Sequence, residues 1–381
     1  MPRDVTQGLL TPGGTIGWMA ASTARGLRDD LVRLAHRGTG VREFSLAAAR
    51  RVARAVPFDG VCVLTLDPAT LLPTGEVVEH GLPPAAIARM TEIELRGQDV
   101  NSFGALARSQ PRAATLSQAT DGDLNRSLRH RELRGPCGFG DELRAALTDG
   151  ATTWGALTLL RQDDQRPFTP ADAGLIASVA GDLAEGLRRA MLLGARPAVP
   201  PRETAAGFAL LAADNTVTMA DAVAERWLAE LDGSGSAAGL PPAVTAVARQ
   251  ARLNATSDAP AAIARARVRT ASGRWLLIRG SVLDDRPDAP TAMSIELARA
   301  HELAPLIVAA YGLSDRERAV TQLVAQGYAT AAIGDRLHLS PWTVQDHLKA
   351  IFEKVGVSTR GELVARLFFD HYAPQLTDYD G

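Results

Sequence analysis

Apolar residues recur at helical spacing near the C-terminal end of the chain, between Leu313 and Phe368. The clearest run has apolar residues at positions i, i+4, i+7 and i+11, which share one face of a helix: Val344, Leu348, Ile351 and Val355. Shorter runs precede it, and another follows it, with Leu363, Val364 and Leu367. The pattern predicts four short helices, of which the second runs roughly from Thr330 to Leu337.

Residues that favour helix ends stand where these runs begin and stop. An S/T-x-x-E capping box opens the first and fourth helices, and Ser340 followed by Pro341 opens the third. Glycine follows the first and third helices. The boxes are Ser314–Glu317 and Thr359–Glu362, and the glycines are Gly327 and Gly356. A short helix, a tight turn at residues 338–339 and a capped helix with one apolar face predict a helix-turn-helix.

The order of residues in this stretch resembles the LuxR-type helix-turn-helix. The matching positions are Leu313, Ser314, Arg316, Glu317, Gly327, Ile333, Leu337, Leu339, Ser340, Thr343, Val344, His347, Leu348, Ile351, Lys354, Val357, Thr359, Arg360, Glu362 and Leu363. The sequence departs from the family at Ala329, Ala332 and Gly334, where a hydroxyl residue, a glutamate and an alanine are usual. These changes weaken the second helix, and we expect Thr330 to cap it instead.

Side chains that read DNA must face away from the apolar stripe of the third helix. That leaves Trp342, Gln345, Asp346, Lys349 and Glu353. The resemblance implies that Gln345, Asp346 and Lys349 contact base edges in the major groove, where Gln suits adenine, Lys suits guanine and Asp accepts from cytosine. It also implies contacts to the DNA backbone from Thr343, His347, Lys354 and Arg360. The alternative is that this face is merely solvated.

The predicted helix-turn-helix carries little net charge. Its seven basic and six acidic residues leave a net charge of +1, so a single copy would bind DNA weakly by electrostatics. Two copies on adjacent half-sites are therefore expected, and the family resemblance implies a homodimer through Leu363, Leu367 and Phe368. Packing of these residues within their own domain is an equal alternative.

The first half of the chain alternates predicted helices with strands. Residues 60–66 read as a buried strand with a hairpin partner at 76–80, and a second hairpin turns at Asp149-Gly150. A long helix runs from residue 169 or 172 through Leu193. This order, and above all residues 154–159 followed by 168–189, resembles a GAF domain.

GAF domains bind small ligands between the sheet and the variable middle segment. The resemblance therefore implies that residues 99–138 form a lid, and that a small-molecule effector contacts Phe103, His130 and Phe139. An unliganded structural or dimerising GAF domain is the open alternative. No cofactor is predicted.

A second α+β module follows a proline-containing linker. Its pattern is a hairpin over residues 207–219, two helices, and three antiparallel strands at 263–270, 275–283 and 291–297. This order resembles a PAS domain. Trp227 and Trp275 are expected in its core rather than in contact with a ligand.

The composition of the chain excludes several classes of function. The chain has 381 residues, a formal net charge of −2 and 46% hydrophobic residues, which predicts a soluble cytoplasmic protein of several domains without a membrane association. No G-x-x-x-x-G-K-[ST] loop occurs, and the histidines are too scattered for a zinc site. We expect no enzyme. The alternative from another class is a thiol enzyme or redox sensor that uses Cys62 and Cys137.

The predicted fold is therefore two α+β sensor domains followed by an all-α four-helix domain. We expect the four-helix domain to bind double-stranded DNA. RNA polymerase is a further candidate partner of the protein. The expected boundaries are a flexible arm at 1–24, a GAF-like domain at 25–193, a linker at 194–204, a PAS-like domain at 205–298, a connector helix at 299–312, the LuxR-type domain at 313–370 and a tail at 371–381.

Overall fold

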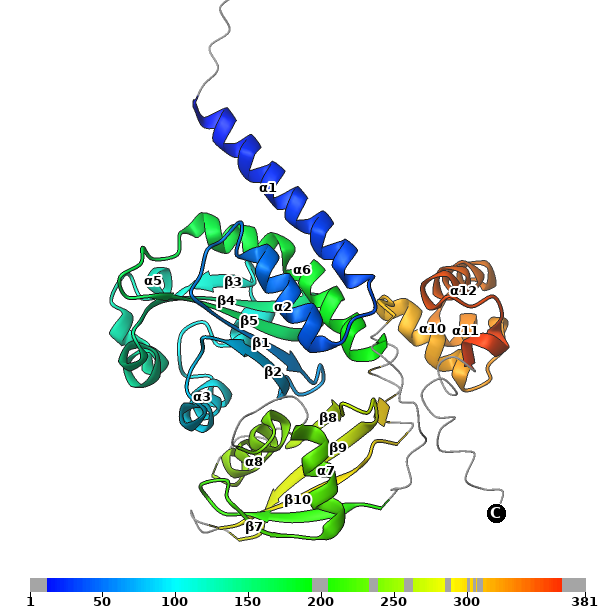
Figure 1. Cartoon of the computed structure of the whole chain (residues 1–381). Coiled ribbons are helices and arrows are strands. Elements are labelled where there is room, and N and C mark those ends of the chain that lie inside the picture. The colour runs from blue at the N-terminus through cyan, green and yellow to red at the C-terminus, as the bar shows by residue number, and fades with distance from the viewer. Residues whose placement is uncertain are drawn as a thin grey trace, which may run out of the picture.

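Two five-stranded antiparallel sheets, each with its own helices, precede a helical C-terminal unit in the computed structural model (Figure 1). The structure describes residues 12–193, 205–232, 239–256, 263–284, 289–299, 302–303, 306 and 311–364. The predicted fold class, two α+β modules followed by a helix-turn-helix, is confirmed.

The sheet of the first module has the strand order β2-β1-β5-β4-β3. Its strands are β1 (Gly60–Leu66), β2 (Pro73–Glu79), β3 (Ala113–Thr115), β4 (Phe139–Asp149) and β5 (Thr152–Gln162). Both predicted hairpins are confirmed, because β1 pairs with β2 and β4 pairs with β5. The β4–β5 hairpin turns at Asp149-Gly150, where Gly150 has the positive φ of 58° that tight hairpin turns require.

Alternate residues of these strands enter two separate cores, as the pleat of a sheet demands. Leu143, Ala145 and Leu147 pack with the three long helices, which are α1 (Pro12–Ala35), α2 (Val41–Val52) and α6 (Pro170–Leu193). Residues of opposite parity, such as Ala146 and Ala156, pack with a lid. The lid comprises α3 (Pro84–Arg96), α4 (Phe103–Arg108), α5 (Leu116–Ala119) and the short turns η1 (Leu124–Arg126), η2 (His130–Arg134) and η3 (Gly135–Cys137).

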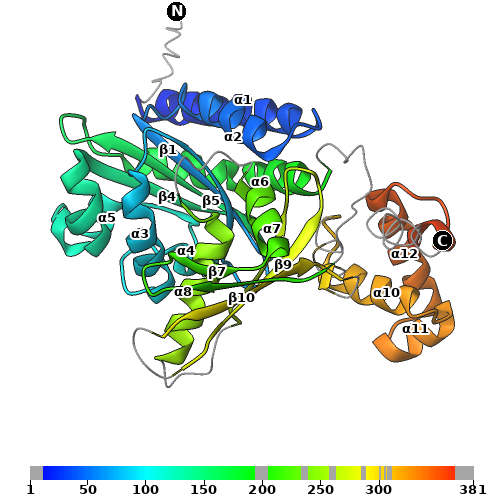
Figure 2. The same ribbon diagram turned by 60° about the horizontal axis from the view of Figure 1, so that its bottom comes forward.

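The flexible arm predicted for residues 1–24 is wrong for residues 12–24. Helix α1 begins at Pro12, and it packs along α6 (Figure 2). The Pro12-Gly13-Gly14 sequence looks like a helix breaker, but proline is tolerated in the first turn of a helix. Leu27, Leu31 and Leu34 anchor the C-terminal half of α1 in the core, from which the helix extends towards the N-terminus. Residues 1–11 lie outside the described part of the chain.

The second module has the strand order β7-β6-β10-β9-β8. Its elements are β6 (Gly207–Leu211), β7 (Val217–Ala220), α7 (Ala222–Asp232), α8 (Pro242–Ala255), β8 (Arg265–Arg269), β9 (Trp275–Val282) and β10 (Thr291–Leu297). The predicted hairpin, two helices and three strands are confirmed. Trp227 and Trp275 are 1% and 8% exposed, as expected of core residues.

The C-terminal unit consists of α10 (Asp315–Ala325), α11 (Thr330–Leu337), α12 (Pro341–Val355) and a further helical segment at residues 360–364. In both views it lies to one side of the two sensor modules (Figures 1 and 2). Of the predicted connector at 299–312, residues 302, 303 and 306 are helical, whereas residues 300–301, 304–305 and 307–310 lie outside the described part. The predicted linker at 194–204 and the tail at 371–381 also lie outside it.

Candidate nucleic-acid interface

Helix α12 is held in place by its caps and by its apolar stripe. The Ser340 hydroxyl accepts a hydrogen bond from the Thr343 amide at 3.1 Å, and Pro341 occupies the first turn. Between α11 and α12, His338 adopts the left-handed conformation with φ 53°. All four stripe residues are buried, so the domain presents the opposite face of α12 to solvent.

The three predicted base-reading residues lie together on that face. Gln345, Asp346 and Lys349 are exposed, and within the described residues no hydrogen bond or ion pair engages them. Lys349 is four residues from Gln345 and three from Asp346, so it neighbours both on the surface of the helix. The geometry therefore leaves them available for an external partner.

The predicted backbone-contacting residues divide into two pairs. Thr343 and His347 are half-buried at the edge of the exposed face. Lys354 instead donates from Nζ to the Glu317 carboxylate at 2.6 and 2.9 Å, and the Arg360 guanidinium donates to the Tyr328 carbonyl. These two cations join elements within the domain, a role that the sequence analysis did not anticipate.

Glu317 shows why Lys354 matters structurally. This residue closes the capping box of α10, where it accepts from the Ser314 amide at 2.7 Å. Burial by itself would raise the pKa of the Glu317 carboxyl, but the bonds from Lys354 and Ser314 outweigh it and hold that pKa below its usual value. Lys354 therefore links the end of α12 to the start of α10.

The start of α11 differs from the prediction. Ala329 is the N-cap residue and has no side-chain bond, while Thr330 is the first helical residue. The expected cap by Thr330 is therefore wrong, since a residue already inside the helix cannot accept from the second or third amide as an N-cap does.

Two of the three predicted dimer-surface residues, Leu367 and Phe368, lie outside the described part of the chain. The third, Leu363, is fully buried in the core of its own domain, at 0% exposure. That is what packing within the domain requires, and it leaves Leu363 no surface for a second copy.

A buried carboxylate of β4 lies under the lid of the first module and is held by arginines. Glu142 of β4 is 1% exposed and receives Arg129 Nε at 2.7 Å and Arg134 Nε at 3.2 Å. Burial alone would raise the pKa of Glu142, but Arg129, Arg144 and Arg134 outweigh it and lower the pKa to about 2. The carboxylate is thus charged at neutral pH.

Phe103, His130 and Phe139, the three predicted ligand-contacting residues, are all buried. The Arg144 guanidinium carbon lies 3.6 Å from the centre of the Phe103 ring. Desolvation is the largest influence on His130 and lowers its pKa, which favours the neutral imidazole. Two of the three predicted residues lie against arginines of the protein itself, Phe103 under Arg144 and Phe139 under Arg134.

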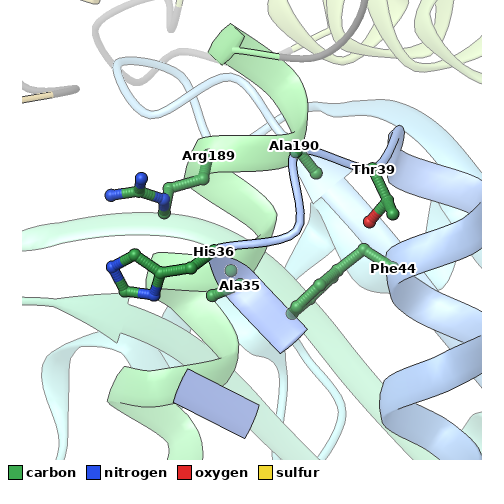
Figure 3. A pocket seen from close by; sticks show the side chains of 8 residues that line it. Ala35, His36, Thr39, Phe44, Arg189 and Ala190 are labelled. Carbon is green, nitrogen blue, oxygen red and sulfur yellow. The ribbon is translucent and has the colours of Figure 1, made fainter. Parts of the chain in front are cut away.

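A cavity of about 110 Å³ lies on the other side of the sheet, between α6 and the α1–α2 loop (Figure 3). Its lining includes Phe44, Thr39 and Ala190, together with His36 of the loop and Arg189 of α6. Ligand sites for drug-sized molecules usually enclose roughly 300–1,000 Å³. This cavity is too small for such a molecule.

The two cysteines lie in different surroundings. Cys62 of β1 is half-buried on the lid side of the sheet, and desolvation, reinforced by Glu76, raises the pKa of its thiol to about 12. A reactive thiol needs a lowered pKa, so Cys62 is poorly suited to the alternative of a thiol enzyme. Cys137 is exposed in η3. Within the described residues no group of three or more histidine, cysteine or acidic side chains could hold a metal ion.

The two sensor modules are joined by a buried ion pair that the sequence analysis missed. Asp67, which follows β1, is 1% exposed and accepts from the Arg267 backbone amide at 2.8 Å and from Nε and Nη2 at 2.9 and 2.6 Å. Arg267 Nη1 also donates to the Glu302 carbonyl at 2.9 Å. Leu72 of the first module enters the core of the second. Two hundred residues separate the pair in sequence, so no local pattern reveals it.

Comparisons with known proteins agree with this geometry. Residues 312–367 match the family of bacterial regulatory proteins, luxR family, and residues 41–187 match the GAF domain. The transcriptional regulatory protein UhpA of Escherichia coli is 46% identical over 56 residues, which cover 15% of this chain and 29% of UhpA. The probable transcriptional regulatory protein NarL of Mycobacterium tuberculosis is 40% identical over 67 residues, which cover 18% of this chain and 28% of NarL.

These matches are partial. The chain spans less than a third of the length of the curated relatives that it matches. Among solved structures, the GAF domain from Acinetobacter phosphoenolpyruvate-protein phosphotransferase is 14% identical, with a TM-score of 0.29 over 46% of this chain and 97% of that one. The phage VqmA–DPO complex is 17% identical, with a TM-score of 0.17 over 44% of this chain and 84% of that one.

Within the described residues, no helix is long and apolar enough to cross a membrane. The capped α10–α12 unit agrees with the match to the luxR family, and the antiparallel sheet with its lid agrees with the match to the GAF domain. The chain carries a GAF domain in its N-terminal half and a LuxR-family helix-turn-helix domain near its C-terminus.

Proposed function

We propose that the protein is a sequence-specific DNA-binding transcription regulator whose N-terminal modules sense a signal. The observation that carries this proposal is the exposed face of α12, where Gln345, Asp346 and Lys349 stand free of partners among the described residues. The second helix of a helix-turn-helix enters the major groove, so these side chains would meet base edges there.

Each contact follows from the chemistry of the side chain. Gln345 can bond adenine through both of its amide atoms, Lys349 can donate to guanine, and Asp346 can accept from the cytosine amino group. Thr343 and His347 would bond phosphates from the edge of the helix. Lys354 and Arg360 would reach phosphates only by sharing their donors with the bonds that they already make inside the domain.

A homodimer completes the proposal. The helix-turn-helix has a net charge of +1, so one copy has little non-specific attraction to DNA. Two copies on half-sites one helical turn apart would double the contacts. Leu367 and Phe368 are the proposed dimer surface, while the burial of Leu363 favours packing within its own domain.

The sensor modules are proposed to act in the cytoplasm on a small-molecule effector, with RNA polymerase as a further partner. Phe103, His130 and Phe139 are the proposed effector contacts. Any ligand there would have to displace or join the arginines around Glu142. The second module is proposed to be PAS-like, on the order of its strands and helices.

DNA binding can be tested with the full-length protein. Sites are first selected from random double-stranded DNA, and affinities for a selected site are then compared between wild type and Lys349→Ala. Loss of a bidentate base contact is worth about 1–3 kcal/mol, so we expect roughly 5- to 150-fold weaker binding. Arg265→Ala removes the same charge from an exposed position in β8 and serves as the matched control.

Either of two results would contradict the proposal. Selection could return no common sequence, or Lys349→Ala and Arg265→Ala could bind the selected site equally well. The second result would mean that α12 is not the reading helix.

A further inference from the structure

Trp342 projects from the first turn of α12 and is 72% exposed. Large exposed apolar side chains occur at several described positions, and Trp342 is the one within the described part of the helix-turn-helix. In the described residues, no hydrogen bond or ring contact involves it. Exposure of an indole is unfavourable in water, so its position calls for a reason.

The position of Trp342 along α12 supplies that reason. It precedes Gln345, Asp346 and Lys349 by three, four and seven residues, so all four side chains share one face of the helix. The helix rises about 1.5 Å per residue, which places Trp342 roughly 10 Å from Lys349 towards the N-terminal end. Residues at that end of a recognition helix are the ones that approach base edges.

The surroundings of Trp342 do not suit a protein partner. Protein-docking surfaces are contiguous apolar patches, whereas the neighbours of Trp342 on this face are an amide, a carboxylate and an ammonium. The same set is complementary to the major groove, which offers hydrogen-bonding edges and one apolar group, the C5 methyl of thymine.

We propose that Trp342 is a fourth specificity-determining residue of α12, and that its indole packs against a thymine methyl group in the major groove. This inference rests on the proposed function. It also explains how a domain of net charge +1 gains short-range affinity that phosphate contacts alone would not supply. The operator would therefore contain a thymine beside the bases read by Gln345, Asp346 and Lys349.

The test combines a protein variant with a DNA variant. A selected site is titrated with full-length wild type and Trp342→Ala by fluorescence anisotropy, using DNA in which each thymine in turn is replaced by deoxyuridine. This replacement removes only the C5 methyl group. We expect about tenfold weaker binding for Trp342→Ala. We also expect a measurable loss for wild type at one thymine of each half-site, with no further loss at that thymine for Trp342→Ala.

Phe208→Ala is the matched control, because Phe208 is an aromatic residue with 60% exposure in the second sensor module. It should bind the selected site as wild type does. Unchanged affinity of Trp342→Ala would overturn the inference. It would also be overturned if the loss of affinity from Trp342→Ala and the loss from the deoxyuridine replacement were independent, so that their fold-changes multiplied. In both cases Lys349→Ala would still weaken binding, so the proposed function would stand. If wild type selects no common sequence, the proposed function fails and this inference fails with it.

Discussion

The sensor modules and the helix-turn-helix use charged side chains in opposite ways. In the sensor modules, Glu142 and Asp67 are 1% exposed and each is held by arginine. On α12, Asp346 and Lys349 are exposed, and in the described structure nothing engages them. A buried charge without its partner is strongly destabilising, while an exposed one loses almost nothing when left alone.

This difference separates the charges that hold the protein together from those that can bind something else. A buried pair is already satisfied, and changing it should alter stability. An exposed, unengaged charge contributes little to stability, and changing it should alter binding. Substitutions at buried pairs should therefore lower the free energy of unfolding most, and substitutions at exposed, unengaged charges least.

The largest effect is expected at the contact between the sensor modules. Arg267→Met should lower the free energy of unfolding by about 3–5 kcal/mol, because it leaves the buried Asp67 carboxylate without its partner. Urea denaturation followed by circular dichroism measures this change. Adding Asp67→Asn to that variant should recover part of the loss, since the unpaired charge is then gone.

Arg265→Met is the matched control for this prediction. Arg265 lies two residues away on the same strand and is exposed. Equal losses for Arg265→Met and Arg267→Met would show that the buried pair has no special weight, and would remove the basis of the comparison.

Acid should weaken the first sensor module through Glu142. Its pKa is about 2 in the folded protein against 4.5 in the free side chain. Because the folded-state value is the lower one, the stabilisation is complete above pH 4.5 and is lost as pH falls towards 2. A shift of this size corresponds to about 3 kcal/mol.

Urea denaturation at pH 5 and pH 3 would show this loss. Glu142→Gln should flatten the dependence on pH, whereas Glu79→Gln, at an exposed position on β2, should leave it unchanged. An identical pH dependence for wild type and Glu142→Gln would place the acid sensitivity elsewhere.

The two lysines of α12 offer the same comparison within one helix. They are the only lysines in the chain. Lys354→Ala should lower the free energy of unfolding by up to about 1 kcal/mol, because it removes the partly exposed ion pair with Glu317. Lys349→Ala should not change it. Thermal unfolding of both variants checks this, and a larger loss for Lys349→Ala would show that the exposed face is structural.

The two thiols should differ in reactivity without any effect on stability. With a pKa of about 12, Cys62 would be thiolate in roughly one molecule in ten thousand at pH 8. Native protein should therefore take up one iodoacetamide label, at Cys137, and denatured protein should take up two. Mass spectrometry counts them, and Cys137→Ser is the control. Two labels on the native protein would revive a redox role for Cys62.

The helix-turn-helix was predictable almost residue by residue, because its signals are local. The Ser314–Glu317 box, the cap at Ser340 and the glycine at residue 356 all act within one helical turn. The exposed face of α12 followed from the spacing of its buried residues. Local reasoning missed the ion pair between Lys354 and Glu317, because the two residues are 37 positions apart in the chain.

The first module shows a different limit. The hairpins and the long helix followed from alternation and turn residues, yet residues 12–24 were expected to form a flexible arm and are instead part of helix α1. A glycine-rich start argues against a helix only where intrinsic helix propensity, and not tertiary packing, determines the local structure. Here Leu31 and Leu34 anchor the C-terminal half of α1 in the core, and the helix continues from there to Pro12.

By itself the sequence determined the elements that depend on neighbours a few residues away: the caps of α10 and α12, the hairpins and the exposed face of α12. The tertiary structure alone decided which charged side chains are buried in ion pairs. Asp67 meets Arg267 across two hundred residues, and Glu142 meets Arg129 and Arg134 because the lid folds back over β4. Coulomb attraction in a buried site acts through space and has no period along the chain.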